Sequence, residues 1–393
     1  MSDHIFLVLD SGVSEAKAYV FDAHDSVLGR AYQPISKTRP NSGWVEQDPD
    51  ELISAARAAL SVAVDQSNVS PNTIISMGIA NQRETVVAWD LATGEALAPA
   101  ILGDDSRTQG WCEQFYGDVA DRIREKTGLL VRATFSASKI RWLLDMNSDV
   151  VKAEEEGKLA VGTVDSWLLF KLSEEGMHMC DMTNASRTLL YNIHGLTWDR
   201  ELLELFGIDP EILPSVRSSR ALYGTLRSDI CGCPAPIEVM CGDQQASMAA
   251  AGFTSHMTKV SYGSKTHVMQ TLGDEFLLED SFLTTLTPDA PIGSVQYALE
   301  ASICDTGEKV TDALGHEEQL KKVLDDIVRQ VDSSLSDLPY PTDTLIVDGG
   351  ITQNDHLIRL QADVTGAEVV RQPIYDGAAL GVMRLLSSIH HGA

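Results

Sequence analysis

Basic residues are scarce in this sequence. It contains 30 Lys and Arg against 57 Asp and Glu, which gives a formal net charge of -27. Repulsion on that scale argues against nucleic acid or an anionic membrane as a partner. No apolar run is long enough to span a bilayer, and the first residues lack the charged and apolar regions of a signal peptide. We therefore expect a cytoplasmic protein whose partners are small molecules.

Cysteine is also sparse, with six residues scattered along the chain. A cytosolic chain would keep them reduced. Cys231-Gly-Cys233 has the spacing of a metal-binding pair, but no second pair or histidine cluster accompanies it. We interpret this segment as a loop that carries two thiols.

Several common catalytic motifs are missing. There is no phosphate-binding Gly-x-x-x-x-Gly-Lys-Ser/Thr loop, and Tyr262-Gly-Ser-Lys-Thr266 matches only its tail, in the wrong order. No Gly-x-Gly-x-x-Gly follows a strand, so dinucleotide binding has no support. Gly12-Val-Ser-Glu-Ala16 lacks the closing glycine of a nucleophile elbow, and His316-Glu-Glu lacks the second histidine of a zinc helix.

The composition that remains is typical of a globular protein, with 44% hydrophobic and 22% charged residues. A chain of 393 residues is too long for one ordinary core, so we expect two domains. Low-complexity tracts and short repeats are absent from the sequence.

Three apolar strands are each followed by an acid and a glycine. They end in Asp10-Ser-Gly12, Gly242-Asp243-Gln and Asp348-Gly-Gly350. In an α/β sheet, ligand-binding groups are usually presented at the carboxyl ends of buried strands. Each instance alone fits a simple turn, and the three together favour a binding site.

The remaining pattern is mixed α/β. Asp48 at an N-cap, Pro49 at the first helical position and an apolar face predict a helix from residue 48 to about 63. Helical patterns recur at 108–126, 138–146, 317–335 and 378–388, and strand patterns at 5–9, 18–22, 27–35, 74–80, 159–164, 259–261, 266–271, 295–299 and 344–347. The stretch 210–236, rich in Pro, Ser, Gly and Cys, is predicted to be connecting structure.

In order along the chain, many segments resemble the FGGY carbohydrate kinases and, within them, the glycerol kinases. The resemblance is carried by Gly43-Trp-Val-Glu-Gln-Asp-Pro49, Asn81-Gln-Arg-Glu-Thr85, Phe135-Ser-Ala-Ser-Lys-Ile-Arg-Trp-Leu-Leu144, Gly162-Thr-Val-Asp-Ser-Trp-Leu168, Thr183-Asn-Ala-Ser-Arg-Thr188, Gly242-Asp-Gln-Gln-Ala246, Tyr297-Ala-Leu-Glu300 and Val347-Asp-Gly-Gly350. Together they extend over nearly the whole chain.

The resemblance implies an α/β fold of two actin-like, hexokinase-like (ribonuclease H-like) domains that flank a cleft. The domains would be residues 1–253, carrying the substrate and the catalytic base, and residues 254–393, a shortened nucleotide side. It also implies transfer of the γ-phosphoryl group of ATP, with Mg²⁺, to a primary hydroxyl of a polyol or sugar. The oligomeric state is left open, and a homo-oligomer is one alternative, because glycerol kinases often form dimers or tetramers.

The resemblance further assigns roles to residues. Asp243 matches the general base, which accepts the proton of the attacking hydroxyl. Asp10, with Asp243, matches the acids that hold Mg²⁺. Arg83 and Glu84 match the pair that binds polyol hydroxyls, Gln244 adds an amide contact, and Thr134 takes the position of a pocket tyrosine.

The nucleotide side follows from the same matches. The first phosphate turn falls on Ser11, Gly12, Ser14 and Lys17, and the second on Gly263, Ser264 and Lys265. The adenosine end falls on Gly349, Gly350 and Asn354, where glycine permits close backbone approach.

This sequence also departs from the family pattern. Val13 and Glu15 stand in the first turn where the family has hydroxyls, and Gly103 and Thr134 replace two aromatic residues of the substrate pocket. Only a short link, 301–316, remains where the family inserts a long segment. Two functions therefore stay open: an active kinase for glycerol or a larger polyol, and a catalytically impaired relative that binds a ligand or regulates.

Overall fold

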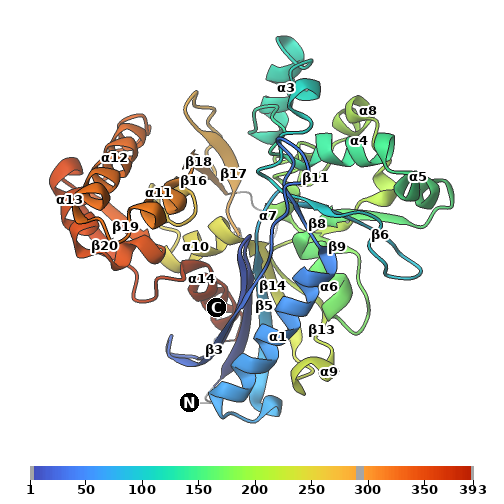
Figure 1. Ribbon diagram of the computed structural model, residues 1–393, viewed down its shortest axis with the longest axis horizontal. Coiled ribbons are helices and arrows are strands. Elements are labelled where there is room, and N and C mark those ends of the chain that lie inside the picture. Colours follow the sequence, from blue (N-terminus) through green and yellow to red (C-terminus); the bar gives the residue numbers. More distant parts are fainter. Residues whose placement is uncertain (1–3, 289–295, 391–393) are drawn as a thin grey trace. The chain divides into compact units, whose positions relative to one another are not determined.

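The computed structural model describes residues 4–288 and 296–390, and it divides into two compact units (Figure 1). Unit 1 comprises Met1–Asp243 and Val382–Ala393, and unit 2 comprises Gln244–Gly381. Each unit contains one six-stranded mixed sheet. Within the described part of the chain, no helix combines the length and apolar character needed to cross a membrane.

The sheet of unit 1 has the strand order β13-β14-β5-β1-β2-β3. Its strands β1, β5 and β14 run parallel, whereas β2, β3 and β13 pair antiparallel with their neighbours. Every residue of β1 is buried, as expected for a strand at the centre of a sheet covered on both faces. The strands are β1 (Ile5–Ser11), β2 (Glu15–Asp22), β3 (Val27–Pro34), β5 (Ile74–Asn81), β13 (Arg220–Thr225) and β14 (Pro236–Gly242).

Helix α1 (Pro49–Ser67) covers one face of this sheet at β2 and β3. Its predicted N-cap is confirmed, because the Asp48 side chain accepts a hydrogen bond from the backbone N–H of Asp50. The buried side of α1 carries the apolar residues that the sequence pattern identified. Gly29 of β3 allows the close approach, since a Cβ there would lie 2.3 Å from the carbonyl oxygen of Ala63.

A second part of unit 1 is built around a four-stranded sheet of order β4-β7-β6-β8. The remaining elements of unit 1 are β4 (Glu46–Gln47), η1 (Pro71–Thr73), β6 (Val86–Asp90), β7 (Ala100–Ile101), α2 (Gln109–Cys112), α3 (Asp118–Thr127), α4 (Ser136–Met146), α5 (Ser148–Glu155), β8 (Leu159–Thr163), α6 (Val164–Leu172), β9 (Met179–Asp181), α7 (Met182–Ala185), β10 (Tyr191–Asn192), β11 (Thr197–Trp198), α8 (Arg200–Phe206), η2 (Pro210–Ile212), β12 (Ser215–Arg217) and α9 (Ser228–Cys231).

Two sequence predictions in unit 1 are wrong. The helix expected over 108–126 is interrupted between α2 and α3, because Gly117 has a φ of +56°, which a helix cannot accommodate. The segment 210–236, expected to be a connection, contains β13, an edge strand of the main sheet. Its local composition favours turns, but pairing with the buried strand β14 determines the outcome.

The sheet of unit 2 has the order β17-β18-β16-β15-β19-β20. Strands β15, β19 and β20 run parallel, and β16, β17 and β18 pair antiparallel. In both units the chain forms antiparallel strands first, three in unit 1 and four in unit 2, and two later strands run parallel to the first of them. The strands are β15 (Thr258–Tyr262), β16 (Thr266–Gly273), β17 (Leu283–Leu286), β18 (Tyr297–Ile303), β19 (Thr344–Asp348) and β20 (Glu368–Arg371).

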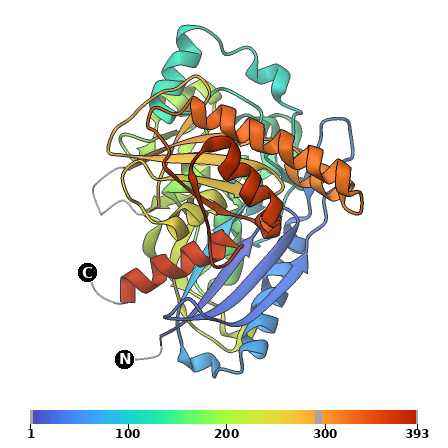
Figure 2. The same cartoon turned by 90° about the vertical axis from the view of Figure 1, so that its left-hand side faces the viewer.

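Helices α12 and α13 pack against this second sheet (Figure 2). The apolar side of α12 contributes Leu324, Ile327, Val328 and Val331 to the core, where they pack with the strand residues Val260 and Val347. The helices and turns are α10 (Asp243–Ala251), α11 (Thr306–Ala313), α12 (Glu317–Ser336), η3 (Gly350–Gln353), α13 (Asp355–Thr365) and α14 (Gly377–His390). The predicted short link 301–316 thus holds the end of β18 and a helix, α11.

The compact units have other bounds than the predicted domains, 1–253 and 254–393, and that domain division remains a prediction. The division falls between Asp243 and Gln244, and residues from Val382 onward return to unit 1. The physical reason is packing: Val382 lies against Gly78 of β5, and Arg384 forms a 2.7 Å ion pair with Asp25. The last turn of α14 adds a 2.6 Å contact between His390 Nε2 and Glu238 Oε2.

Candidate active site

The parallel strands of unit 1 bring predicted site residues to one edge of the sheet. In the register, Asp10 of β1 lies beside Ala80 of β5, which lies beside Cys241 of β14. The chain leaves β5 into Gln82-Arg83-Glu84 and leaves β14 into Asp243. Since the carboxyl ends of parallel strands share an edge, the Asp10, Arg83 and Asp243 side chains start from the same edge.

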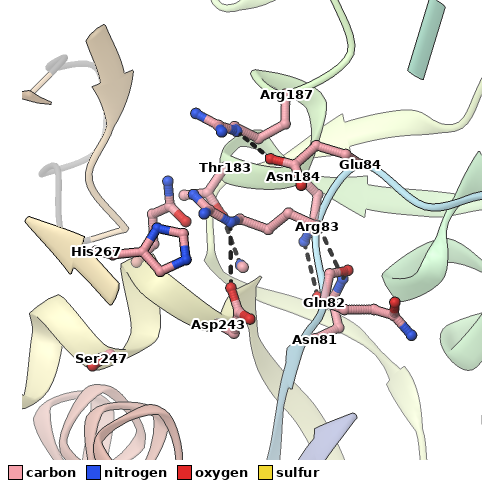
Figure 3. Close-up of polar contacts among 12 residues, drawn as sticks. Asn81, Gln82, Arg83, Glu84, Thr183, Asn184, Arg187, Asp243, Ser247 and His267 are labelled. Carbon is pink, nitrogen blue, oxygen red and sulfur yellow. Dashed lines mark hydrogen bonds and ion pairs between the residues drawn. The ribbon is translucent and has the colours of Figure 1, made fainter. Parts of the chain in front are cut away.

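Arg83 and Asp243 contact each other directly (Figure 3). Arg83 Nε lies 3.3 Å from Asp243 Oδ1. The Arg83 side chain is only 4% exposed, whereas the Asp243 carboxylate is 30% exposed. The buried guanidinium therefore orients a carboxylate that a small molecule can still reach.

Glu84 is held by a second arginine. Arg187 Nε donates to Glu84 Oε1 at 2.7 Å (Figure 3). The Glu84 carbonyl accepts a hydrogen bond from Ser136 Oγ at 3.1 Å. Glu84 has a φ of +67°, a left-handed conformation that is uncommon for a residue with a side chain. Backbone strain of this kind is typical of functional sites.

A polar network fixes the ends of β5 and β14. The side-chain amides of Asn81 and Asn184 bond to each other at 2.9 and 3.0 Å, and Thr183 Oγ1 accepts from the Gly242 N–H at 2.9 Å. Asn184 is bonded in turn to Asp181. The sequence resemblance included Thr183 and Asn184 without assigning them a role, and the structure shows that they brace the strands that carry Arg83 and Asp243.

Asp181 of this network lies beside a second buried acid, Asp165, whose Oδ2 accepts a hydrogen bond from the Asp181 N–H at 3.0 Å. Burial, followed by the charge of Asp181, raises the pKa of Asp165 to about 7. Asp181 keeps hydrogen bonds from Ser219 Oγ at 2.7 Å and Asn184 N at 2.9 Å. Asp165 stands in one of the segments that carry the family resemblance, but the sequence assigned no role to it or to Asp181, because the pair forms only when α6 and β9 pack together.

The first predicted phosphate turn connects β1 and β2. It is closed by a hydrogen bond from the Gly12 N–H to the Glu15 carbonyl at 3.0 Å. Ser11 is buried, and its Oγ has no hydrogen-bond partner, whereas Ser14 is exposed. Lys17 Nζ lies 3.6 Å from Glu15 Oε1 and 3.9 Å from Asp10 Oδ2. The turn thus offers a cation between two acids.

Thr134 lies beside a buried lysine. Lys139 Nζ donates to the carbonyls of Thr134 and Leu102 at 2.5 and 3.0 Å. Burial lowers the pKa of Lys139 to about 8, although the Glu84 and Asp105 carboxylates oppose the shift. At Gly103, a Cβ would lie 3.2 Å from Glu84 Oε2, so Leu102, Thr134 and Glu84 belong to one neighbourhood.

Unit 2 carries the second predicted phosphate turn, between β15 and β16. The Gly263 N–H donates to the Lys265 carbonyl at 3.1 Å. The start of α11 packs on this turn: the Gly307 N–H donates to the Ser264 carbonyl at 3.1 Å, and Thr306 Oγ1 donates to the Gly263 carbonyl at 3.2 Å. Thr306 and Gly307 were not predicted to lie near the site.

The predicted adenosine end follows β19. Gly349 has a φ of +94°, and a Cβ there would lie 2.2 Å from the Tyr262 carbonyl oxygen, so only glycine fits. At Gly350 a Cβ would meet no atom within 4 Å, which leaves that backbone open to a ligand. Asn354 is the N-cap of α13, where its Oδ1 accepts from the His356 N–H at 2.9 Å.

The predicted site residues therefore form two groups. Unit 1 brings together Asp10, Arg83, Glu84 and Asp243, with the first turn beside them. Unit 2 holds Gly263 to Lys265, Gly349 and Gly350, and it also contains Gln244, the second residue of α10.

The donors in each group suit the cofactors that the family resemblance implies. Within residues 4–288 and 296–390, no cluster of three or more His, Cys, Asp or Glu is arranged to hold a metal ion. Mg²⁺ does not require one, since it usually binds one or two carboxylates together with water and substrate phosphates. The Asp10 and Asp243 carboxylates fit this requirement, and the unpartnered Ser11 Oγ beside Asp10 fits a polar ligand.

Comparison with known proteins gives matches along the chain. The N-terminal domain profile of the FGGY family of carbohydrate kinases matches residues 5–252, and the C-terminal domain profile matches residues 319–388. A glycerol kinase of Thermococcus onnurineus is 33% identical over 98% of this chain and 88% of its own length. One of Chromobacterium violaceum is 34% identical over 98% of this chain and 89% of its own length.

The length difference from these relatives is small. The first alignment spans 440 positions, more than the 393 residues of this chain, so that relative has residues with no counterpart here. This chain is nevertheless only slightly shorter, since the matches cover almost nine tenths of each relative.

Solved structures share the fold. A Plasmodium falciparum glycerol kinase with ADP superposes with a TM-score of 0.88 at 24% identity, over 98% of this chain and 90% of that one. A xylulose kinase from Rhodospirillum rubrum gives a TM-score of 0.84 at 18% identity, over 98% and 90%. The expected fold of two actin-like α/β domains is confirmed by these similarities.

Proposed function

The chain belongs to the FGGY family of carbohydrate kinases, and from this premise we propose that it transfers the γ-phosphoryl group of ATP to a primary hydroxyl of glycerol or a related polyol. It is a carbohydrate kinase by family, and its relatives of 33 and 34% identity are glycerol kinases. The proposal concerns the donor, the acceptor and the residues that act on them.

The observation that carries the proposal is the contact between Arg83 and Asp243. A hydroxyl is a poor nucleophile, so a carboxylate within hydrogen-bond reach must accept its proton as the new bond to phosphorus forms. Asp243 is partly exposed at the carboxyl edge of the sheet, and Arg83 Nε fixes its Oδ1 at 3.3 Å. In this mechanism Asp243 is the general base, and the proton passes from the substrate hydroxyl to its carboxylate.

The substrate hydroxyls would be bound by Arg83 and its neighbour Glu84. Arg83 donates and Glu84 accepts, so the pair can bind two neighbouring hydroxyls of a polyol. Arg187 holds Glu84 in place through a 2.7 Å bond. Gln244 and Thr134 add polar contacts in this proposal, and Gly103 leaves the wall beside Glu84 without a side chain.

The nucleotide would use the two turns and the end of β19. Ser11, Gly12, Ser14 and Lys17, with Gly263, Ser264 and Lys265, would receive phosphate groups through N–H, hydroxyl and ammonium donors. The open backbone at Gly350 would receive the adenosine, beside Gly349 and Asn354. Asp10 and Asp243 would hold Mg²⁺, which neutralises charge on the transferring phosphoryl group when bound.

The test is an ADP-release assay with Mg·ATP and glycerol, erythritol or pentoses as acceptors, comparing the wild type with Asp243→Asn. Removing the base should lower kcat by roughly 100- to 10,000-fold with little change in KM. Asp363→Asn, the same exchange at an exposed position of α13, is the matched control and should keep the wild-type rate.

The outcomes separate the two functions that the sequence left open. A substrate-dependent rate that is lost only in Asp243→Asn supports the kinase and identifies its acceptor. A folded wild type that binds ADP but releases none from ATP with any acceptor would instead indicate a ligand-binding relative without chemistry.

A further inference from the structure

Unit 2 contains a buried polar cluster that none of the proposed steps uses. It consists of Ser247 on α10, Lys259 and Ser261 on β15, and Asp348 at the end of β19. The side chains of Lys259 and Asp348 are 1% and 2% exposed. An ion pair at this depth is unusual, because charged residues are rarely fully buried.

The Lys259 ammonium reaches one oxygen from each of three elements. Its Nζ lies 2.5 Å from Ser247 Oγ, 2.5 Å from Ser261 Oγ and 2.8 Å from Asp348 Oδ1. Ser247 Oγ donates to the second oxygen of Asp348, Oδ2. A lysine has three N–H donors and no acceptor, so this arrangement matches its full donor capacity.

The start of α14 closes the cluster against water. A Cβ at Gly377 would lie 1.6 Å from Asp348 Oδ2 and 2.8 Å from Ser247 Oγ, and one at Gly381 would lie 1.7 Å from the Ala246 carbonyl oxygen. Both clashes involve atoms of α10 or of the cluster itself. The two glycines therefore let α14 seal the ion pair.

Two predicted nucleotide-binding segments begin at this cluster. Asp348 is followed directly by Gly349 and Gly350, and Ser261 is followed, after Tyr262, by the turn at Gly263. The two segments also touch, since a Cβ at Gly349 would lie 2.2 Å from the Tyr262 carbonyl oxygen. The Gly349 N–H is fixed by the Tyr375 carbonyl at 2.9 Å.

A buried ion pair adds little to stability compared with well-packed apolar side chains, because both charges lose their hydration. What such a pair supplies is geometry, since three elements must meet one ammonium group in a fixed arrangement. We propose that Lys259, through Asp348 and Ser247, is a positioning residue that aligns the Gly349–Gly350 backbone and the 263–265 turn to receive the nucleotide. This inference rests on the proposed function, because it assumes that these segments bind ADP and ATP.

The experiment is a calorimetric titration of the full chain with Mg·ADP. Lys259→Met and Asp348→Asn each remove one charge at nearly constant volume. Misplacement of a binding group by about 1 Å costs up to a hundredfold, so we expect ADP affinity to fall on the order of tenfold or more. In steady-state assays KM for ATP should rise by the same factor, while KM for the polyol and kcat stay near wild type.

Lys139→Met is the matched control. Lys139 is another fully buried lysine, but it lies in unit 1, where it donates to the carbonyls of Leu102 and Thr134. Its removal should leave ADP affinity unchanged. A general loss of stability would weaken the binding of both the nucleotide and the polyol in every variant. A positioning role weakens nucleotide binding only when the unit 2 cluster is changed.

If Lys259→Met or Asp348→Asn does not fold, Ser247→Ala decides the question, since it removes one bridge and keeps the ion pair. A folded Ser247→Ala or Lys259→Met with wild-type ADP affinity overturns the inference. A wild-type protein that does not bind ADP overturns the proposed function itself, and the inference with it. Weaker ADP binding in the cluster variants, with Lys139→Met unchanged, supports both.

Discussion

Replacing Arg83 by alanine should separate substrate binding from nucleotide binding. The Arg83 side chain is 4% exposed and lies 3.3 Å from the Asp243 carboxylate. In the proposed complex the guanidinium also donates to a polyol hydroxyl. A hydrogen bond from a charged donor contributes about 1.5–3 kcal/mol, so its loss should raise KM for the polyol roughly 10- to 150-fold.

Two controls make this result specific. Arg83→Lys keeps the positive charge but loses the planar donor pair, and it should recover part of the substrate affinity. KM for ATP should stay within about twofold of wild type in both variants, because the proposal assigns Arg83 to the polyol and not to the nucleotide.

The assay is steady-state kinetics with each substrate varied in turn, together with thermal unfolding to establish that the variants fold. Arg83→Ala with an unchanged KM for the polyol would refute the assignment of Arg83 to substrate binding. An equal rise in both KM values would also refute it, since it would indicate a general disturbance of the fold.

Two further predictions concern stability. Gly29→Ala places a Cβ 2.3 Å from the Ala63 carbonyl oxygen of α1, whereas the Cβ of Gly110→Ala meets nothing within 4 Å. Urea denaturation should show that the free energy of unfolding falls by about 1–3 kcal/mol in Gly29→Ala and does not fall in Gly110→Ala. Equal stabilities of the two variants would contradict the packing of α1. Burial lowers the pKa of Lys139 from 10.5 to about 8, so between these values the unfolded chain holds a proton that the folded protein has released. The free energy of unfolding should therefore rise with pH across this window by up to about 3 kcal/mol relative to Lys139→Met, and a constant difference from pH 7.5 to 10.5 would disprove the shift.

Much of unit 1 could be predicted because its signals are local. The short apolar run from Ile5 to Leu9 predicts a buried strand, as the structure shows for β1. The N-cap at Asp48 predicts where α1 begins. The acids and glycines at the ends of β1, β14 and β19 are the local signal behind the prediction that these strand ends carry functional groups. The roles of Asp10 and Asp243 remain predictions from family resemblance.

Other features depended on partners far away in the sequence. The residues of β13 favour turns, yet they form an edge strand because β14 offers backbone partners. The part of α14 from Val382 onward belongs to unit 1 because Val382 packs against β5 at Gly78. Such contacts between residues distant in the sequence cannot be predicted from local composition.

The sequence by itself determined most strands of the two six-stranded sheets, the first helix, the glycines at the turns and, through resemblance, the family. Only the tertiary structure decided which polar groups meet: Arg83 with Asp243, Arg187 with Glu84, and Lys259 with Asp348. The physical reason is range. Backbone preferences and hydrophobic periodicity act over a few residues, whereas a buried charge acquires its partner only after strands distant in the sequence have paired and excluded water.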